Sequence, residues 1–391
     1  MRNPFEFGRE LAADELVDRQ DELATLREAL LSGGKVFLIG PRRFGKTSLL
    51  RSAAEQVERE GAVVLRYDAQ AFPTLEQLAA RIAADTAQRL TSTLEKAGTA
   101  IREFFASVRP AATYEATENK WSLTLAGTPG RETGPSLLAD VLDGVERAAI
   151  ATGRTVAVVI DEFQEVVEDG GEEAEEQIRA AIQRHRQVGY AFAGSKTRML
   201  ADMVTGANRP FYRMGKPIFL GPVPRADFAE FLARGFAGAG IPVEAGAIDA
   251  LLDAAEEVPY NVQLLAHACW TACMATIGTD GAGAARPLTA ALVHEVRDRE
   301  ALRHDPFYTQ LWTSLPSTQR RALVAVLRER GDGLSSTPVA RRYGMPVTTL
   351  QRAIEALVAK QIVREDHARG GVRLRLEDPL FGAWIGLVVR E

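Results

Sequence analysis

The sequence predicts an α/β protein whose main domain contains a largely parallel β-sheet and is followed by helical domains. Two observations lead to this prediction: short runs rich in Val, Ile, Phe and Ala, and the helical spacing of apolar residues in the segments between them. The runs lie at residues 35–40, 62–70, 155–163, 190–195 and 216–223. Because parallel strands are covered by helices on both faces, continuous apolar runs of this kind are typical of them.

The segments around these runs complete the predicted order of elements. DRQDELATLREALL, at residues 18–31, is predicted to be a short amphipathic helix, and another helix follows the first strand and runs to about Glu60. Residues 92–135 interrupt the alternation with TYEATENKWSLTLAG, which indicates a hairpin inserted between the second and third strands. This hairpin either covers the sheet or docks a partner.

Helical patterns dominate after the last apolar run. RADFAEFLARGFAGAG and AIDALLDAAEEVPYNVQLLAHACWTACMATIG both have apolar residues at helical spacing, and GTDGAGAARP then indicates a flexible connection. Cys269 and Cys273, the two cysteines of the chain, lie four residues apart within the second pattern. They are predicted to be core residues rather than a disulfide or half of a metal site.

Composition and charge argue against two classes of protein, indiscriminate nucleic-acid binders and membrane proteins. The 391 residues carry a net charge of −5, which argues against indiscriminate nucleic-acid binding. Residues 305–391 differ from the rest, with 13 Lys and Arg against 9 Asp and Glu. No apolar run is long enough to span a membrane, and MRNPFEFGRE lacks the apolar core of a secretory signal, so we expect a cytoplasmic protein with no membrane partner.

The most specific motif is GPRRFGKT, directly between the first strand and the following helix. It fits the pattern G-x-x-x-x-G-K-[ST] of a phosphate-binding loop, or P-loop, and the strand before it and helix after it are the context that the pattern requires. In such a loop backbone N–H groups face the phosphates, the lysine reaches the β- and γ-phosphates, and the threonine hydroxyl meets Mg²⁺. The predicted nucleotide-binding residues here are Gly40, Pro41, Arg42, Arg43, Phe44, Gly45, Lys46, Thr47 and Ser48.

A second part of the predicted site follows the apolar run VAVVI. Asp161 lies at the carboxyl end of this strand, where open parallel sheets bind ligands, so its carboxylate is predicted to hold Mg²⁺ beside Thr47. Glu162 comes next and is the candidate base that polarises an attacking water, with Lys46 as its catalytic partner. An acid pair that only caps the next segment is the alternative.

Further polar residues follow the fourth and fifth apolar runs. Ser195 ends YAFAG and is predicted to contact the γ-phosphate or the water, although a strand-end serine without a function is the alternative. Cationic residues cluster just beyond it, any of which could offset charge during phosphoryl transfer or simply be solvated. They are Arg198, Arg209, Arg213 and Lys216, with Arg213 taken as the catalytic candidate.

Together these motifs resemble an AAA+-related P-loop ATPase of the archaeal type, near the STAND group and distantly similar to origin-recognition ATPases. The resemblance extends over nearly the whole chain through NPF, LVDRQDEL, GPRRFGKTSLL, VVIDEFQEV, FAGSKTRML, RPFYRMGKPIFLGPV, VPYNVQLLAH and DPLFGAWI. It implies that ATP and Mg²⁺ are the cofactors. The lack of a guanine-reading N-K-x-D motif also favours ATP over GTP.

The resemblance implies roles for residues outside the P-loop. In this family the box before the first strand lies near the adenine, which implicates Arg19 and Glu22, although Asp18 stands where a glycine is usual. Ser195 matches the first sensor of the γ-phosphate. Pro259 lies in the segment that resembles the lid motif facing the nucleotide, but no second-sensor arginine is evident there. This departure favours a slow, switch-like ATPase over a motor.

The pattern of the C-terminal segment indicates a second function, the binding of DNA or of a protein. Residues 318–376 read as three helices followed by a two-stranded hairpin turning at Gly370 and Gly371, which indicates a winged helix-turn-helix. Such a domain binds duplex DNA or docks a protein, and the sequence does not separate the two. The residues predicted near the start of the recognition helix are Thr348, Thr349, Gln351 and Arg352, and those predicted near phosphates are Arg341, Arg342, Arg369 and Arg373. DPLFGAWI is predicted to be a terminal core segment.

The predicted organisation has three domains. Residues 1–223 form a P-loop ATPase core with the inserted hairpin segment at about 92–135, residues 224–300 a helical lid, and residues 301–391 a winged helix-turn-helix. The predicted function is slow, Mg²⁺-dependent ATP hydrolysis that acts as a switch on DNA, on a protein partner or within a homo-oligomer. The alternative is a regulatory or scaffold protein that binds nucleotide without hydrolysis; a helicase or translocase is disfavoured because no channel of alternating basic and aromatic residues is visible.

Overall fold

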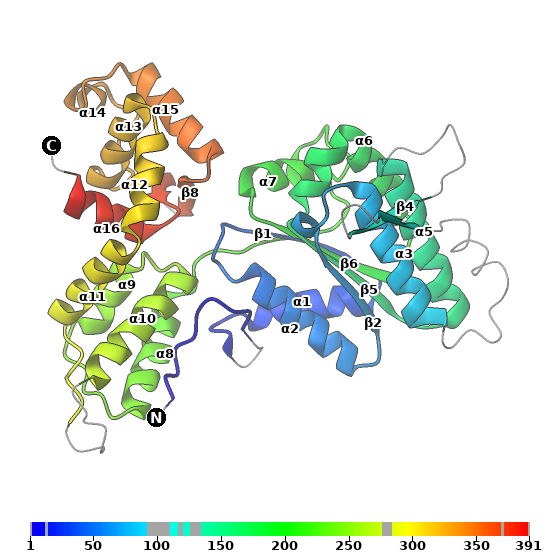
Figure 1. Ribbon diagram of the computed structural model, residues 1–391, viewed down its shortest axis with the longest axis horizontal. Helices are drawn as coiled ribbons and strands as arrows, with labels where there is room; N and C mark the ends of the chain where they lie inside the picture. The colour runs from blue at the N-terminus through cyan, green and yellow to red at the C-terminus, as the bar shows by residue number, and fades with distance from the viewer. Residues whose placement is uncertain are drawn as a thin grey trace. The chain divides into compact units, whose positions relative to one another are not determined.

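The chain folds into two compact units in a computed structural model, shown in Figure 1. The structure describes residues 2–11, 15–91, 110–115, 120–125, 134–275, 284–368 and 371–389. One unit, Glu10–Gly221, is called the α/β unit below. The other combines Met1–Arg9 with Pro222–Glu391 and is called the helical unit. The chain therefore passes between the units twice, after residue 9 and after residue 221.

The α/β unit contains a five-stranded parallel sheet with the order β2-β5-β6-β1-β7. Its strands are β1 (Lys35–Ile39), β2 (Val63–Asp68), β5 (Val156–Asp161), β6 (Val188–Gly194) and β7 (Lys216–Phe219). Each strand falls on one of the five apolar runs, so the predicted parallel sheet is confirmed. β5 and β6 are buried along their whole length, as expected for central parallel strands covered on both faces.

Helices cover both faces of this sheet (Figure 1). α1 and α2 pack on one face, while α3, α5, α6 and α7 lie on the other. The bounds are α1 (Gln20–Leu31), α2 (Lys46–Arg59), α3 (Leu75–Thr91), α5 (Gly134–Thr152), α6 (Gln164–Ile182) and α7 (Thr197–Thr205), with a short 3-10 helix η2 (Ala69–Ala71) after β2. Aliphatic and aromatic side chains from the sheet and from the second helical layer form one contiguous core, which fixes the carboxyl ends of the strands in place.

The predicted hairpin insertion falls partly outside the described residues. β3 (Pro110–Glu115) and β4 (Lys120–Leu125) pair antiparallel and form a separate two-stranded sheet between β2 and β5 in the sequence. The Glu118–Asn119 turn and the segments on either side of the hairpin lie outside the described residues. The position of the insertion in the sequence agrees with the predicted one.

The first half of the helical unit contains α8 (Arg225–Gly238), α9 (Ala247–Ala254), α10 (Pro259–Met274) and α11 (Ala290–Arg303). The sequence pattern predicted helical structure across residues 247–278, and within this segment the structure ends α9 at Ala254 and begins α10 at Pro259. The break has a local cause, because proline is favoured in a first helical turn and disfavours helix for the residue before it. Cys269 and Cys273 are buried free thiols on α10, which confirms them as core residues.

The N-terminal segment belongs to the helical unit although it precedes the α/β unit in sequence. Phe5 is fully buried, with its ring 4.8 Å from that of Phe236 and 5.8 Å from that of Phe231 on α8. The Asn3 amide donates to the carbonyl of His267 on α10 (3.1 Å), and the His267 ring nitrogen Nδ1 lies 2.7 Å from the Phe5 carbonyl oxygen. The NPF segment is therefore an anchor that ties the start of the chain to α8 and α10.

The second half of the helical unit contains helices and an antiparallel hairpin. In order these are α12 (Asp305–Ser314), α13 (Ser317–Arg328), α14 (Thr337–Arg342), α15 (Val347–Ala359), β8 (Val363–Ala368), β9 (Gly371–Leu376) and α16 (Pro379–Val388). α16 carries the closing segment, and its Phe381 and Trp384 are buried as predicted. Among the described residues no helix is long and apolar enough to cross a membrane.

Candidate nucleotide-binding site

The glycine loop connects β1 to α2 over residues 40–45. Two of its residues have left-handed backbone conformations, Arg43 with φ +66° and Gly45 with φ +87°. Gly40 is required for a different reason: a Cβ built on it would lie 2.9 Å from both the Cβ and the carbonyl oxygen of Leu220. The first glycine thus allows close packing against the segment after β7, and the second allows the turn into α2.

Lys46 and Ser48, in the first turn of α2, are buried. The Lys46 ammonium donates to the carbonyl of Pro41 (2.9 Å), so the side chain folds back along its own loop. The Ser48 hydroxyl accepts a hydrogen bond from the backbone N–H of Leu11 (3.0 Å). Phe44 is also buried, whereas Arg42 and Arg43 are exposed. The loop therefore keeps its cation next to the first helical turn, whose N–H groups lack intrahelical partners.

Thr47 on α2 and Asp161 at the end of β5 are in direct contact, although they are far apart in the sequence. The Thr47 hydroxyl donates to Asp161 Oδ2 (2.6 Å), while Asp161 Oδ1 accepts from the backbone N–H of Glu162 (2.9 Å). Burial raises the pKa of the Asp161 carboxyl above its usual range, and the Thr47 hydrogen bond and the nearby Lys46 ammonium act in the opposite direction. A cation at this position would offset the same desolvation.

The oxygen donors at this point fit Mg²⁺. A threonine hydroxyl and an aspartate carboxylate lie within hydrogen-bond distance of each other at the end of a parallel strand and next to a lysine ammonium. Hard oxygen ligands of this type, completed by phosphate oxygens and water, are what Mg²⁺ prefers. Thr47 and Asp161 are therefore the residues that could hold the metal.

Three hydrogen bonds restrain the Glu162 side chain. Its Oε2 accepts hydrogen bonds from the Ser195 hydroxyl (2.9 Å), from the Ser195 backbone N–H (3.3 Å) and from the Gln164 amide. Glu162 itself has φ +50°, an uncommon value for a residue with a side chain. The structure thus brings the predicted base and the predicted first sensor into direct contact.

Gln164 is the residue of this cluster that the sequence analysis missed. Its side chain is fully buried at the start of α6, and its amide nitrogen reaches Glu162. The signal was available in the motif VVIDEFQEV, where a second polar residue follows the acid pair by two positions, directly after Phe163. A buried glutamine there requires a polar partner, and Glu162 supplies it.

Arg19 lies within the α/β unit, and its side chain is buried. Its guanidinium donates to Glu22 (3.1 Å) and to the carbonyl of Gly221 (2.6 Å), and burial lowers its pKa from the ordinary value. Asp18, which replaces the usual glycine, has φ +46°, so the left-handed backbone is kept without the glycine. Both predicted polar residues of the adenine box are thus joined to each other.

Two of the four cationic residues predicted after β6, Arg209 and Lys216, have partners other than Glu162. Arg209 pairs with the fully buried Glu175 of α6, and Lys216 reaches the Thr25 hydroxyl (3.4 Å). Arg213 is exposed, with φ +54°, and its guanidinium lies 5.1 Å from the ring centre of Tyr212. Within the part of the chain that the structure describes, Arg213 forms no hydrogen bond to Glu162, so its catalytic role stays a prediction.

Pro259 begins α10 in the helical unit. Its predicted approach to the nucleotide stays a prediction.

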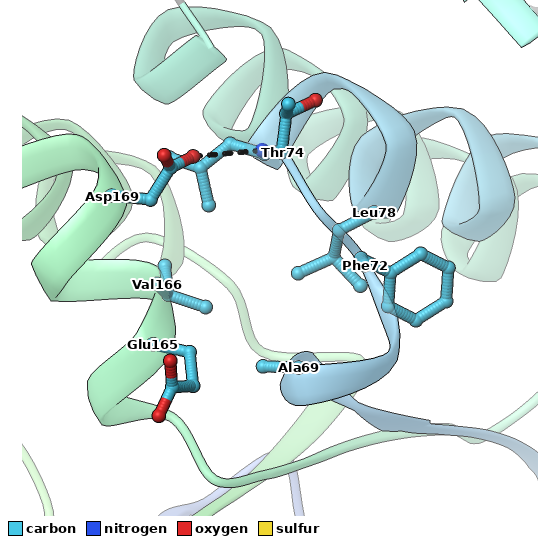
Figure 2. Close-up of a pocket in the computed structure, with 8 residues that line it drawn as sticks. Ala69, Phe72, Thr74, Leu78, Glu165, Val166 and Asp169 are labelled. Carbon is cyan, nitrogen blue, oxygen red and sulfur yellow. Dashed lines mark hydrogen bonds between the residues drawn. The ribbon is translucent and has the colours of Figure 1, made fainter.

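A hollow within the α/β unit, shown in Figure 2, lies between η2, the start of α3 and the start of α6. It measures about 200 Å³ including the open solvent at its mouth and is lined by Ala69, Phe72, Thr74, Leu75, Leu78, Glu165, Val166 and Asp169. The Asp169 carboxylate accepts from the Leu75 N–H (3.0 Å) on its rim, and the P-loop residues do not line it.

Comparisons with known proteins agree with this geometry. Residues 15–191 match the family model described as the AAA ATPase domain, a range that includes the P-loop, the acid pair and β6 up to residue 191. A Walker-type ATPase of Pyrococcus abyssi has a similar structure, with a TM-score of 0.59 at 18% identity over 98% of this chain and 99% of that chain. The ORC2 protein of Aeropyrum pernix, solved as ADPNP-ADP complexes, gives a TM-score of 0.56 at 14% identity over 99% and 98%.

No curated protein matches the chain significantly. The family match and the two structures agree on an α/β fold of the AAA+ P-loop ATPase type, and the match to the ATPase domain supports a nucleotide-binding ATPase. At these identities the structural likenesses concern the fold.

Proposed function

We propose that the protein is a slow, Mg²⁺-dependent ATPase that works as a nucleotide-controlled switch, coupled through a helical lid to a C-terminal winged helix-turn-helix. The observation that supports it most directly is the arrangement around Asp161: a P-loop lysine and threonine on one side and a restrained glutamate on the other. A protein that only holds nucleotide does not need a glutamate next to its metal ligand. The proposed placement near the STAND group rests on the sequence motifs alone.

The proposed roles follow the chemistry of each group. Residues 40–48 hold the phosphates through backbone N–H groups and Lys46, and Thr47 and Asp161 hold Mg²⁺, which when bound neutralises charge on the β- and γ-phosphates. Glu162 accepts a proton from the attacking water, and Ser195 positions either that carboxylate or the γ-phosphate. Arg19 and Pro259 are proposed nucleotide contacts outside the loop.

Arg213 is retained as the proposed cation that offsets charge on the transferring phosphoryl group. Arg209 is less suited to that role because its guanidinium is committed to Glu175. An exposed arginine can act on its own site or on that of a second copy of the chain, so a homo-oligomer is included among the proposed partners.

The contacts of Glu162 support slow turnover. Its Oε2 must give up hydrogen bonds to Ser195 and Gln164 before that oxygen can accept a proton from water. The same contacts favour the second candidate function, a regulatory protein that binds ATP without hydrolysing it. The two candidates differ in one measurable quantity, the rate of Mg²⁺-dependent phosphate release.

We propose duplex DNA as the ligand of residues 318–376, with a protein partner as the alternative. α13, α14 and α15 followed by the β8–β9 hairpin have the order of a winged helix-turn-helix. Thr348, Gln351 and Arg352 are exposed at the start of α15, as base-contacting residues need to be. Arg342 and Arg373 are paired with Glu329 and Asp332, so part of the positive charge is already compensated.

The test is ATP turnover of the full-length protein with Mg²⁺, with and without duplex DNA, in a cytoplasm-like buffer. Lys46→Ala is expected to abolish nucleotide binding and turnover. Glu162→Gln is expected to keep ATP binding but lose turnover by a factor of about 10²–10⁴. Glu176→Gln, an exposed acid on α6, is the matched control and is expected to behave like wild type.

Each outcome discriminates between the candidates. Turnover of Glu162→Gln at the wild-type rate would show that the assigned base is wrong. Firm ATP binding without turnover in wild type, with and without DNA, would favour the regulatory protein. Stimulation of turnover by DNA would support the proposed DNA ligand, and turnover indifferent to DNA would shift the C-terminal domain to protein docking.

A further inference from the structure

The segment that leaves the α/β unit is in contact with the phosphate loop. Leu220 packs against Gly40 so closely that no Cβ would fit there, and its N–H donates to the Ile39 carbonyl (2.7 Å). The next residue, Gly221, accepts the hydrogen bond of the Arg19 guanidinium (2.6 Å). A shift of Gly40 therefore acts directly on Leu220, the residue before the last one of this unit.

Four residues further along the chain, the segment is fixed again inside the helical unit. The guanidinium of Arg225, the first residue of α8, binds three carboxylates: Glu257 (2.8 Å), Asp253 (2.9 Å) and Asp249 (2.9 Å). The carboxylates come from α9 and from the turn after it. The entry of the chain into the helical unit is thus held both by α9 and by the turn after it, residues 255–258, which is called the α9–α10 turn below.

The α9–α10 turn has an unusual backbone. Glu256 and Glu257 are consecutive residues with φ +49° and φ +58°, a region that side-chain-bearing residues rarely adopt. The Glu257 N–H closes the turn on the Leu252 carbonyl (3.1 Å), and Val258 and Pro259 then begin α10. Such a conformation persists only where surrounding contacts determine it, and here the two carboxylates are held by different partners.

The second carboxylate of the turn reaches the β8–β9 hairpin. Glu256 Oε2 lies 3.7 Å from Arg364 on β8 and 3.7 Å from Arg375 on β9. These two arginines are directly opposite each other in the hairpin register. Like charges in that position repel each other, so Glu256, together with Asp366 next to Arg375 (3.0 Å), offsets the repulsion.

We propose that residues 220–225 and the α9–α10 turn relay the nucleotide state of the P-loop to the β8–β9 hairpin. Glu257 senses the position of the entering segment through Arg225, and Glu256, held in the same strained turn, sets the position of the hairpin through Arg364 and Arg375. The relay rests on the proposed function and identifies its regulatory connection. In this relay, ATP binding at the P-loop changes the position of the β8–β9 hairpin, which follows α15 in the sequence.

The test measures coupling between nucleotide and hairpin in the full-length protein. Hydrogen exchange of peptides covering residues 363–376 is followed with and without a non-hydrolysable ATP analogue and Mg²⁺. In wild type the analogue is expected to change the exchange rate of the hairpin by at least about five-fold. Glu256→Gln, which keeps the shape of the side chain but removes its charge, is expected to lose most of that change.

Two further variants and a control make the test specific. Arg375→Gln removes the other end of the contact from a more exposed position, and the double variant with Glu256→Gln is expected to lose no more than either single variant. Glu230→Gln is the control, because Glu230 is 69% exposed on α8 and lies outside the turn. All of these variants are expected to bind the analogue within about two-fold of wild type.

The outcomes separate the relay from the proposed function. A full exchange response in Glu256→Gln, or additive losses in the double variant, would overturn the relay. A wild-type protein that binds the analogue without any change in the hairpin would overturn the relay and leave nucleotide binding intact. Failure of wild type to bind the analogue would overturn the proposed function and the relay with it.

Discussion

The two glycines of the P-loop are predicted to be required for different physical reasons, which a pair of substitutions separates. In Gly40→Ala the new methyl group would lie 2.9 Å from two atoms of Leu220, against an ordinary carbon contact of about 3.5–4.0 Å. Leu220 is buried, and its N–H donates a hydrogen bond to the Ile39 carbonyl. The overlap is therefore relieved only by a shift of β7 or of the loop. Overpacking of this kind costs about 1–3 kcal/mol.

Gly45→Ala meets no steric conflict, because nothing lies within 4 Å of its Cβ position. Its cost comes from φ +87°, a left-handed conformation that is about 1–2 kcal/mol unfavourable for alanine. Alanine also restricts the unfolded chain, which returns about 0.4–1 kcal/mol. The net loss of stability is therefore expected to lie between about 0 and about 1.6 kcal/mol.

The assay is native-state hydrogen exchange of β1 in the absence of nucleotide. Gly40→Ala is expected to lower the protection of the Lys35–Ile39 amides by about 5–150-fold, and Gly45→Ala by less than about 15-fold, since 1.4 kcal/mol corresponds to a factor of ten. Equal losses in the two variants, or a larger loss in Gly45→Ala, would refute the assignment of Gly40 to close packing and Gly45 to backbone conformation.

Two further predictions concern stability. Phe5→Ala should destabilise the helical unit by about 3–5 kcal/mol, measured by hydrogen exchange of α8 and α10, because the ring is fully buried; Phe7→Ala, 40% exposed, should cost clearly less, and equal losses would contradict the anchor. Burial lowers the pKa of His185 in the folded protein, so as pH falls this histidine is protonated in the unfolded chain first. The free energy of unfolding should therefore fall as pH drops below about 6.5, by about 1.4 kcal/mol for each unit by which burial lowers the pKa. Urea unfolding between about pH 5 and 8 should show this fall in wild type and in His294→Gln, a control at an exposed histidine. If His185→Gln showed the same fall, His185 would not be its cause.

Much of the α/β unit could be predicted from the sequence because its signals are local. Each of the five strands is a continuous apolar run, and the loop between β1 and α2 has its glycines and lysine at a characteristic spacing. Thr47 and Asp161 could be paired in advance, since the carboxyl ends of parallel strands meet at one edge of a sheet.

Other features depended on contacts that no local pattern encodes. The stretch around Pro259 had helical spacing throughout, yet the chain turns at Glu256 and Glu257, whose left-handed backbone is held by partners far away in sequence. The sequence gives no reason to separate Arg209 from Arg213, whereas the structure pairs Arg209 with Glu175 of α6.

The sequence by itself determined the class of fold, the P-loop and the acid pair, since backbone periodicity and short motifs are properties of adjacent residues. Only the tertiary structure decided that Gln164 and Ser195 hold Glu162, that Leu220 packs on Gly40 and that the N-terminal NPF segment is anchored to α8 and α10. Each of these contacts joins side chains that reach one another only after the elements carrying them have packed, because their partners are set by the folded geometry and not by spacing along the chain.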